Sequence, residues 1–281
     1  MDMTTLYDVA LMPLAYIAVF GMLFLVAKWI KDLFTPYSLN KELAEHDNTP
    51  ISLTMAGYYI AVALIFVSQL SGPSQGLKAD LLAVSGFSLI GILMLNLSRW
   101  INDKAILRTF CNIQKLTQDK DIGVGVIQFA VYLSTGLIAA GSLGGQGTVL
   151  SFLVFFVLGQ ASLVLFSVVY SRVAPYHLYD ELDNQNTAVA VAFSGTLVGT
   201  GLLIKNGVSG DFSNWQTDLS QFAVSVVLGL VLLPLLLRLF DRLVVPGKSL
   251  NREMVNERSV ASGLLVAAMS VSFGLVITQL V

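Results

Sequence analysis

Long stretches without any Asp, Glu, Lys or Arg constrain the fold of this chain more than any motif in it. They cover residues 9–27, 48–77, 81–98, 122–171, 184–204, 219–237 and 259–281. About 20 apolar residues in a helix cross the roughly 30 Å hydrocarbon layer of a bilayer, whereas a surface helix of a soluble protein is apolar on one side only. Charged residues make up only 12% of the chain, against about 25% in an average soluble domain. The sequence therefore predicts a polytopic membrane protein.

The number of spans follows from a break in the longest charge-free stretch. The segment "AAGSLGGQGT" lies in its middle, and the glycines of this segment are typical of a tight turn between helices. The start of the chain lacks the cationic region and cleavage site of a secretory signal, so the first apolar segment is expected to remain as a helix. We predict an all-α fold with eight transmembrane helices near residues 11–33, 49–70, 80–101, 122–142, 148–171, 187–205, 218–240 and 259–281.

The basic residues predict the orientation of these spans. Of the 16 Lys and Arg residues, only Lys78 and Lys205 lie in connections on one side. Because basic connections are retained in the cytoplasm, the other side is predicted to be cytoplasmic and both termini are predicted to lie outside. The residues assigned to the cytoplasmic connections are Lys28, Lys31, Lys41, Arg99, Lys104, Arg108, Lys115, Lys120, Arg172, Arg238, Arg242, Lys248, Arg252 and Arg258.

A tandem repeat appears when the chain is shifted by 138 residues against itself. The Asn-Thr pair at Asn48 then falls on the Asn-Thr pair at Asn186, and a slip of one residue brings "TPYSLNKEL" onto "APYHLYDEL". Shared hydrophobicity does not explain such matches, so we interpret the chain as a duplication with domains at residues 1–146 and 147–281. Four spans per copy give both copies one orientation, which predicts parallel four-helix repeats about a pseudo-two-fold axis, with spans two and six at the centre.

The Asn-Thr junction predicts the start of a helix in each copy. Asn48 and Asn186 are expected to be N-cap residues, because an Asn side chain accepts a hydrogen bond from a backbone N–H that has no partner inside the helix. Acidic residues just upstream would lie near the positive end of the helix dipole. This structural interpretation accounts for the junction without any ligand.

A functional interpretation of the same acids stays open beside the structural one. The two clusters would converge on the cytoplasmic face as an acidic collar that attracts cations or polyamines. Its members are Glu42, Glu45, Asp47, Asp180, Glu181 and Asp183. Glu42 with His46, and His177 with Glu181, have the spacing of a shared helix face, but two ligands per copy make no complete metal site. We therefore predict no metal and no cofactor.

Polar and small residues inside the spans predict helix packing. Gln128 and Gln160 are expected to form hydrogen bonds between helices. Small residues let helix backbones approach closely, and the positions that stand out are Gly57, Gly195 and Gly199. None of the charge-free stretches holds an ionisable residue of the kind that marks a proton relay or an ion pathway, which weighs against a proton-driven or sodium-driven pump.

The junction Asn-Thr-Ala-x₆-Gly at Asn186, together with the later "NERSVASGLLVAAMSVSFG", resembles the bacterial inner-membrane family called domain of unknown function 350, or YjfL-type proteins. In the first half Pro50 replaces the Ala of this pattern. The resemblance covers the chain as two copies. It implies an inner-membrane location and a setting near envelope-stress and polyamine-related genes, and it implies no activity.

Two classes of function follow. The first is a structural or interaction component of an envelope-stress-related membrane system, with the basic turns as its contact surface. The second is a channel or weakly selective transporter for small cations or polyamines, with its pore near the pseudo-two-fold axis. No catalytic motif is present, so an enzyme is not expected. The lipid bilayer is the predicted partner, a homo-oligomer and a cytoplasmic or membrane protein partner are left open, and no nucleic acid is expected.

Overall fold

The computed structural model describes residues 11–72, 74–107, 112–241, 243 and 249–280, and every element within them is helical. Eight helices are long and apolar enough to cross a bilayer, so the predicted all-α fold with eight spans is confirmed. The long helices are α2 (Met12–Leu33), α4 (Thr49–Ser68, continued by the 3-10 turn η2, Gln69–Ser71), α5 (Leu77–Ala105), α7 (Ile122–Leu143), α8 (Val149–Val173), α10 (Thr187–Val208), α11 (Trp215–Phe240) and α13 (Val260–Leu280). The short helices are α3 (Leu39–Ala44), α6 (Asn112–Thr117), α9 (Leu178–Asp183) and α12 (Leu250–Asn256).

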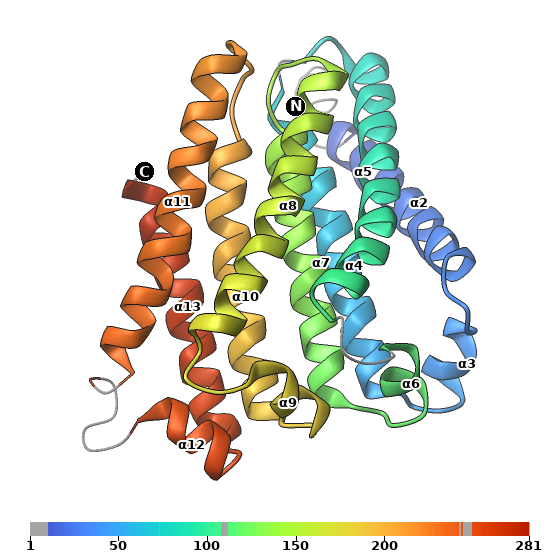
Figure 1. The fold of residues 1–281 in the computed structure, drawn as a ribbon. Helices are drawn as coiled ribbons and strands as arrows, with labels where there is room; N and C mark the ends of the chain where they lie inside the picture. The colour runs from blue at the N-terminus through green and yellow to red at the C-terminus, as the bar shows by residue number, and fades with distance from the viewer. Residues whose placement is uncertain (1–10, 73, 108–111, 242, 244–248, 281) are drawn as a thin grey trace.

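The four short helices lie together at one end of the bundle (Figure 1), which we call the inner end. Each of them is followed by a single residue in the left-handed backbone region, with φ between 45° and 56°. Such a residue ends a helix and turns the chain sharply. The four residues are Asp47, Lys120, Gln185 and Arg258. As a result α4, α7, α10 and α13 all start at the inner end and run in the same direction.

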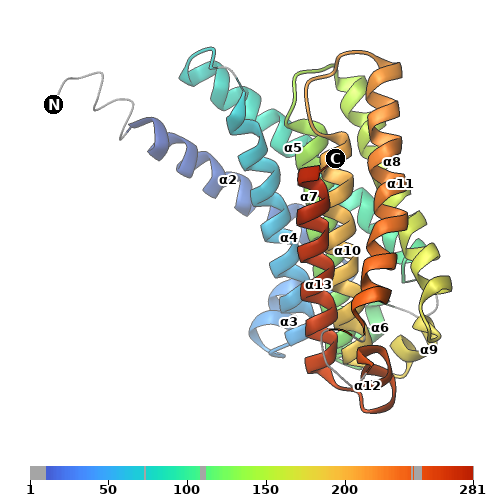
Figure 2. The same cartoon turned by 90° about the vertical axis from the view of Figure 1, so that its left-hand side faces the viewer.

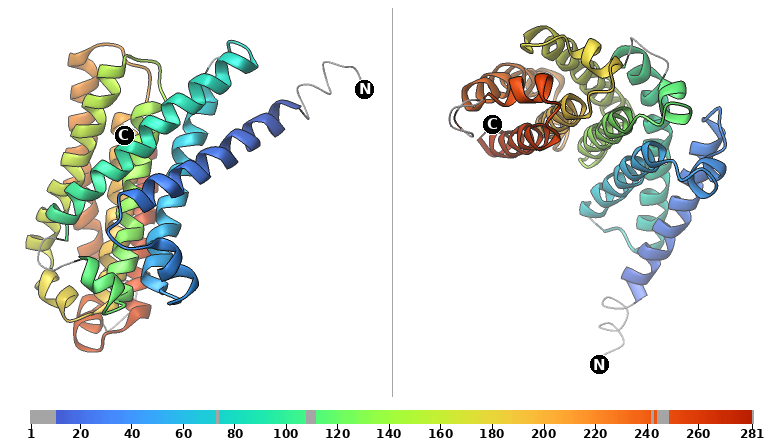
Figure 3. Two further views of the ribbon diagram at one scale, coloured as in Figure 1. Left: turned by 90° about the vertical axis from the view of Figure 1, so that its right-hand side faces the viewer. Right: turned by 90° about the horizontal axis from the view of Figure 1, so that it is seen from below.

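These four parallel helices pack side by side in the order α4, α7, α10, α13 (Figure 3, right). Close approach of their backbones depends on glycine. A methyl group added at Gly57 of α4 would lie 2.6 Å from the carbonyl oxygen of Phe129 in α7, and one added at Gly195 of α10 would overlap the Cα atom of Ala267 in α13. In a bilayer such contacts stabilise helix pairs through van der Waals packing. We call this layer the central row.

The two inner members of the central row form the core of the molecule. In the most apolar stretch of α7 and of α10, 78% of the residues are buried, against 50% for α4 and 33% for α13. The expectation that spans two and six share the centre is therefore wrong for span two, because α4 lies at one end of the row. The repeat predicts which segments correspond, but it does not say which of them meet.

The remaining long helices cover the central row. Helix α8 packs on both α7 and α10, while α5 packs on α7 and α11 packs on α10 and α13. Helix α2 leans away from the bundle (Figure 2), and only 11% of its most apolar stretch is buried. Of the residues assigned to basic connections, Arg108, Arg242 and Lys248 lie outside the described residues, as does the single cysteine, Cys111.

Substitution of a glycine tests the close packing of the central row. Gly195→Val is expected to separate α10 from α13, because the new side chain would collide with the backbone of Ala267, and overpacking of this kind costs about 1–3 kcal/mol or more. We expect a lower thermal unfolding midpoint in detergent, measured by circular dichroism. Gly86→Val in α5 is the matched control, because a methyl group there meets no atom within 4 Å, and an equal loss in both variants would contradict the prediction.

Candidate functional site

Asn48 lies at the inner end and joins three segments of the first half. It is the N-cap of α4, and its Oδ1 accepts a hydrogen bond from the backbone N–H of Ile51 at 3.2 Å. Its Nδ2 donates to Oε2 of Glu42 in α3 at 2.8 Å and to the carbonyl oxygen of Leu116 in α6 at 2.9 Å. One buried amide therefore starts α4 and holds both short helices against it.

Asn186 repeats this arrangement in the second half. It is the N-cap of α10, and its Oδ1 accepts from the backbone N–H groups of Ala188 and Val189. Its Nδ2 donates to Oε2 of Glu181 in α9 at 2.7 Å and to the carbonyl oxygen of Met254 in α12 at 3.0 Å. The junction that occurs twice in the sequence is thus a hydrogen-bonded clamp that occurs twice in the fold.

The acidic collar divides into held and exposed carboxylates. Glu42 is buried and also contacts Nδ1 of His46 at 3.1 Å, and Glu181 is half-buried beside Asn186. The other members, Glu45, Asp47, Asp180 and Asp183, are exposed. Asp183 pairs with Lys115 of α6 at 3.3 Å, which links the inner ends of the two halves. Among the described residues, no three His, Cys, Asp and Glu side chains are grouped so that they could hold a metal ion.

Charged residues do lie on the spanning helices of the first half, contrary to the expectation of uncharged spans. Lys31 is completely buried on α2, where its Nζ donates to the hydroxyl of Tyr132 and lies over the rings of Tyr132 and Tyr58, at 4.4 and 5.4 Å from their centroids. The Tyr58 hydroxyl donates to the carbonyl oxygen of Ala27 at 2.9 Å and accepts from Nδ2 of Asn96 at 3.1 Å. The sequence pattern predicts that Lys31 lies in a cytoplasmic connection, and this prediction is wrong because Lys31 lies on α2.

An ion pair on α5 continues this polar region. Nε of Arg99 lies 3.4 Å from Oδ2 of Asp103, and both side chains are mostly buried. Gln128 of α7 donates to the other oxygen of Asp103 at 2.5 Å. Tyr37, in the connection after α2, lies beside this pair; burial raises the pKa of its hydroxyl, and Arg99 nearby opposes that shift. The sequence pattern also predicts that Arg99 lies in a connection, because the charge-free stretch ends at residue 98. This prediction is wrong, since α5 continues to Ala105.

Gln160 of α8 belongs to a further set of two amides and a hydroxyl, which includes Asn102, the neighbour of Asp103 in the chain. Its Oε1 accepts from Nδ2 of Asn102 at 3.3 Å and from the hydroxyl of Thr135 at 3.4 Å. Both predicted intramembrane amides, Gln128 and Gln160, thus bind neighbouring helices. We call these residues the first-half polar network, because all of them except Gln160 of α8 belong to the first half. They are Lys31, Tyr58, Asn96, Arg99, Asn102, Asp103, Gln128, Tyr132, Thr135 and Gln160.

The first-half polar network retains hydrogen-bonding capacity. Several of its buried atoms have no hydrogen-bond partner in the described part of the chain: Oδ1 of Asn96, Oδ1 of Asn102, Oε1 of Gln128 and Nε2 of Gln160. Because an unpaired polar atom in a low-dielectric interior costs free energy, water bound at these atoms would stabilise the network.

A cavity of about 620 Å³ occupies the corresponding place in the second half. At the repeat offset of 138 residues, Pro234 replaces Asn96, Leu237 replaces Arg99 and Val266 replaces Gln128, and all three replacements line the cavity. With the slip of one residue, Tyr170 takes the position of Lys31 and Tyr176 that of Tyr37. Smaller and apolar side chains therefore leave space where the first half holds its charges.

The polar groups around this cavity bond to one another. The Tyr170 and Tyr176 hydroxyls are 2.9 Å apart, and burial raises the pKa of Tyr176. Asp241, the counterpart of Asp103, accepts hydrogen bonds from Ser249 at 2.8 Å and from the backbone and side chain of Asn251. The same frame thus carries a buried ionic network in one copy and, in the other, an open cavity whose lining includes the charged residues Arg238, Asp241 and Arg252.

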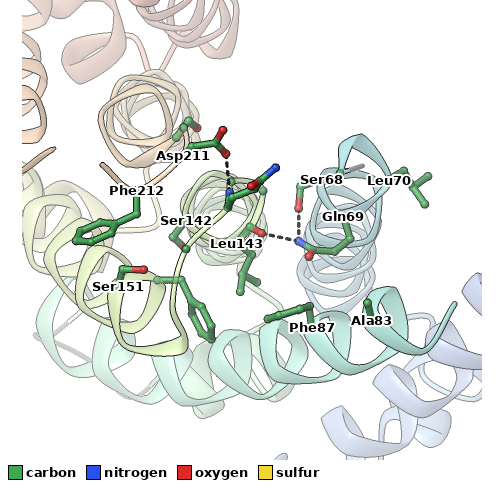
Figure 4. A pocket seen from close by; sticks show the side chains of 18 of the residues that line it. Ser68, Gln69, Leu70, Ala83, Phe87, Ser142, Leu143, Ser151, Asp211 and Phe212 are labelled. Atoms are coloured by element: carbon green, nitrogen blue, oxygen red, sulfur yellow. Dashed lines mark hydrogen bonds between the residues drawn. The ribbon is translucent and has the colours of Figure 1, made fainter. Parts of the chain in front are cut away.

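The end of the bundle opposite the inner end, which we call the outer end, carries a second cavity of about 460 Å³ between the two halves (Figure 4). Gln69 donates to the carbonyl oxygen of Leu143 at 3.2 Å, and the backbone N–H of Gln146 donates to Asp211 at 2.6 Å across the junction. Asp80 and Asp218, which correspond in the repeat, also line the cavity. Their carboxylates accept hydrogen bonds from Ser74, Gln75 and Ser213 in adjacent turns, so they stabilise the starts of α5 and α11.

Comparison with known proteins follows the repeat. The family described as Domain of Unknown Function (DUF350) matches residues 5–143 and again residues 146–281. The UPF0719 transmembrane protein of Aquifex aeolicus (strain VF5) is 22% identical over 259 residues, which cover 90% of this chain and 93% of that protein. The UPF0719 inner membrane protein YjfL of Escherichia coli (strain K12) is 38% identical over 52 residues, which cover 18% of this chain and 39% of that protein. No solved structure matches.

The clamp predicts a specific loss of stability. Asn186→Ala removes an N-cap, worth about 1 kcal/mol, and also leaves the Met254 carbonyl and Glu181 without a donor. We expect a lower midpoint of unfolding in detergent and faster hydrogen exchange in α9 and α12. Asn184→Ala, at an exposed position nearby, is the control. Equal protection of α12 in the two variants would contradict the clamp.

Removing a charge at Asp103 and removing one at Lys31 are predicted to have opposite effects on the stability of the protein. Asp103→Leu is expected to destabilise the protein by roughly 1–3 kcal/mol, because Arg99 and Gln128 would lose their acceptor. Lys31→Met is expected to preserve or raise stability, because a buried cation is replaced by an apolar chain of similar size. Thermal unfolding in detergent measures both effects, with Asp119→Leu and Lys28→Met as controls at less buried positions. A large loss with Lys31→Met would refute this account of the network.

Proposed function

The chain belongs to the DUF350 family over both of its halves, and we propose that it acts as a structural or interaction component of the bacterial inner membrane. The resemblance first seen at the Asn-Thr junction adds an envelope-stress setting to this proposal. The inner end would face the cytoplasm, as the positive-inside rule requires, and both termini would lie outside. The two domains would be parallel repeats at residues 1–146 and 147–281.

The direct packing of α7 on α10 carries this proposal. A methyl group added at Gly123 would lie 3.0 Å from Cβ of Ala190 near the inner end, and one added at Gly201 would lie 2.8 Å from Cβ of Ser134 in the middle. A methyl group added at Gly141 would lie 2.8 Å from a carbonyl oxygen of α10 near the outer end. A pore between the halves would need space along this line, so a solid scaffold fits the packing better.

The contact surface of this scaffold would be the inner end. Its exposed basic side chains outnumber those of the outer end among the described residues: Lys41, Lys104, Lys120, Arg172, Arg238, Arg252 and Arg258. Such side chains bind anionic headgroups and acidic segments of cytoplasmic proteins. Exposed acids of the collar, such as Glu45 and Asp183, lie at the same end, so the surface carries both signs of charge. In the described part of the chain, the turns at the outer end are short, which suits a protein that makes its protein contacts on the cytoplasmic side.

A channel or transporter is the second candidate, and the first-half polar network favours it. Ionisable residues inside a membrane span are costly and commonly mark ion or proton pathways. A conduit would then pass through the first half, between α2, α4, α5 and α7, and not along an axis between the halves. Lys31 would be its most sensitive position, because it is buried on all sides.

Flux through liposomes separates the two functions. We expect purified protein to give no more K⁺, Na⁺ or spermidine flux than protein-free liposomes. Flux that Lys31→Met abolishes and Lys28→Met preserves would overturn the scaffold in favour of the transporter. Both lysines lie on α2, so Lys28→Met controls for the effect of removing a lysine from this helix.

The scaffold also predicts a partner that depends on the inner end. A protein cross-linked to the chain in native membranes is expected to be recovered several-fold less with the double variant Arg252→Glu and Arg258→Glu. Lys78→Glu with Lys205→Glu, on the outer side, should leave recovery unchanged. Equal recovery in both double variants would remove the proposed contact surface.

A further inference from the structure

Helices α4 and α13, at the ends of the central row, each have a face that corresponds to a packed face of α10 or α7 in the middle of the row. Within the row, α7 uses one face for α4 and the opposite face for α10, while α10 uses one face for α7 and the other for α13. The end helices α4 and α13 each use one face only. Their second faces point away from the row (Figure 3, right).

The contact of α7 with α10 defines what these second faces could bind. At one point Gly123 faces Ala190, and at another Ser134 faces Gly201. The Ser134 hydroxyl also donates across the junction to the carbonyl oxygen of Leu197 at 2.9 Å. Small side chains and one hydroxyl therefore bring the two halves together.

The repeat places similar small residues on the second faces of α13 and α4. At the offset of 138 residues, Gly123 and Ser134 of α7 correspond to Ala261 and Ser272 of α13, and both of these are exposed. Ala190 of α10 corresponds to Ser52 of α4, which is also exposed.

Two more positions complete the second face of α4. Leu197 and Gly201 of α10 correspond to Tyr59 and Ala63 of α4, which are partly exposed. Tyr59 stacks on Phe24 of α2, with ring centroids 4.2 Å apart. Neither second face packs on another helix of the central row, so the two sides of the internal junction recur at opposite ends of the described molecule.

Helix α2 gives a second and independent indication. Its counterpart α8 bridges α7 and α10, and half of its apolar stretch is buried (50%). Helix α2 packs on α4 and α5, as α8 packs on α10 and α11. Among the described helices, none packs on α2 in the position that α7 occupies against α8. Only 11% of its apolar stretch is buried. The missing neighbour of α2 would be a copy of α13.

A relative about half as long as this chain shows how such a contact would arise between chains. The matched 52 residues are 39% of the Escherichia coli protein, so that protein is about as long as one repeat of this chain. A single repeat has no second half to cover its row. Where one repeat forms a chain, any junction like that of α7 with α10 has to join two molecules.

We propose that α13 of one copy packs on α4 of a second copy, head to tail, with Ala261 near Ser52 and Ser272 near Ala63. The second copy would also place its α2 against the first copy's α13. Such a heterologous contact repeats around an axis along the membrane normal, and it closes into a ring when the rotation allows. The inner-end pair of Lys115 with Asp183 is not reproduced, since Glu253 takes the lysine's position; the helix faces alone hold the copies together. This assembly does not depend on either proposed function.

Cysteine cross-linking in native membranes tests the contact. In a Cys111→Ser background, which removes the single cysteine, chains with Ser52→Cys and chains with Ala261→Cys are co-expressed and oxidised. We expect disulfide-linked dimers in the mixture and at most one-tenth as many from either variant alone, because a head-to-tail contact pairs unlike faces. Val227→Cys, on the exposed side of α11, mixed with Ser52→Cys, is the matched control.

Two results would overturn the proposal. One is a mixed yield no higher than that of the control, and the other is cross-linking of each variant with itself, which would indicate a face-to-face dimer. A second measurement avoids dependence on disulfide geometry. Native mass spectrometry should give oligomers for the wild type and for Val227→Trp, and monomers for Ser272→Trp. Monomers for the wild type in lipid nanodiscs would also refute the contact.

Discussion

Close approach of helix backbones at small residues is the interaction on which this molecule depends. Inside a bilayer, apolar side chains gain little by leaving lipid for protein, so helices associate through van der Waals packing and hydrogen bonds. The central row meets this condition at Gly57 against α7, at Gly201 against Ser134, and at Gly195 against α13. The covering helices pack on the surface of the central row, whose shape depends on these close contacts. Lipid-facing positions remain large and apolar, as on α2 and α11.

The inner end converts this packing into a defined order of helices. Every helix of the central row begins after a short helix and a residue of positive φ. In two of the four cases an asparagine both caps the long helix and binds the short helices on either side of it in the chain. The cap satisfies backbone N–H groups that would otherwise be unpaired near lipid. Because the same asparagine side chain also binds the short helices, one residue both caps the long helix and fixes its neighbours.

The sequence predicts much of the fold and little of the site. Charge-free length predicts the eight spans to within a few residues, and Asn48 and Asn186 are recognisable as caps because of the residues that follow them. The buried charges are missed because Lys31 and Arg99, near the ends of the predicted spans 11–33 and 80–101, are counted with the connections that follow. In the structure, α5 continues past Arg99 to Ala105. The spacing of Asn96, Arg99 and Asp103 along one face of α5 is a signal that could have shown them. The order of helices in the central row is missed because the sequence repeat shows which helices correspond between the halves. It does not show which helices are in contact.

The replacement of a charged network by a cavity in the second half has a consequence for stoichiometry. Lys31 and Arg99 have no basic counterparts at Tyr170 and Leu237, so the two copies have diverged in chemistry while keeping one frame. Two separate single-repeat chains of different chemistry would mix in proportions set by their expression. In a fused pair, each chain carries one buried ionic network and one open cavity. Their ratio is therefore one to one in any larger structure that the molecule builds.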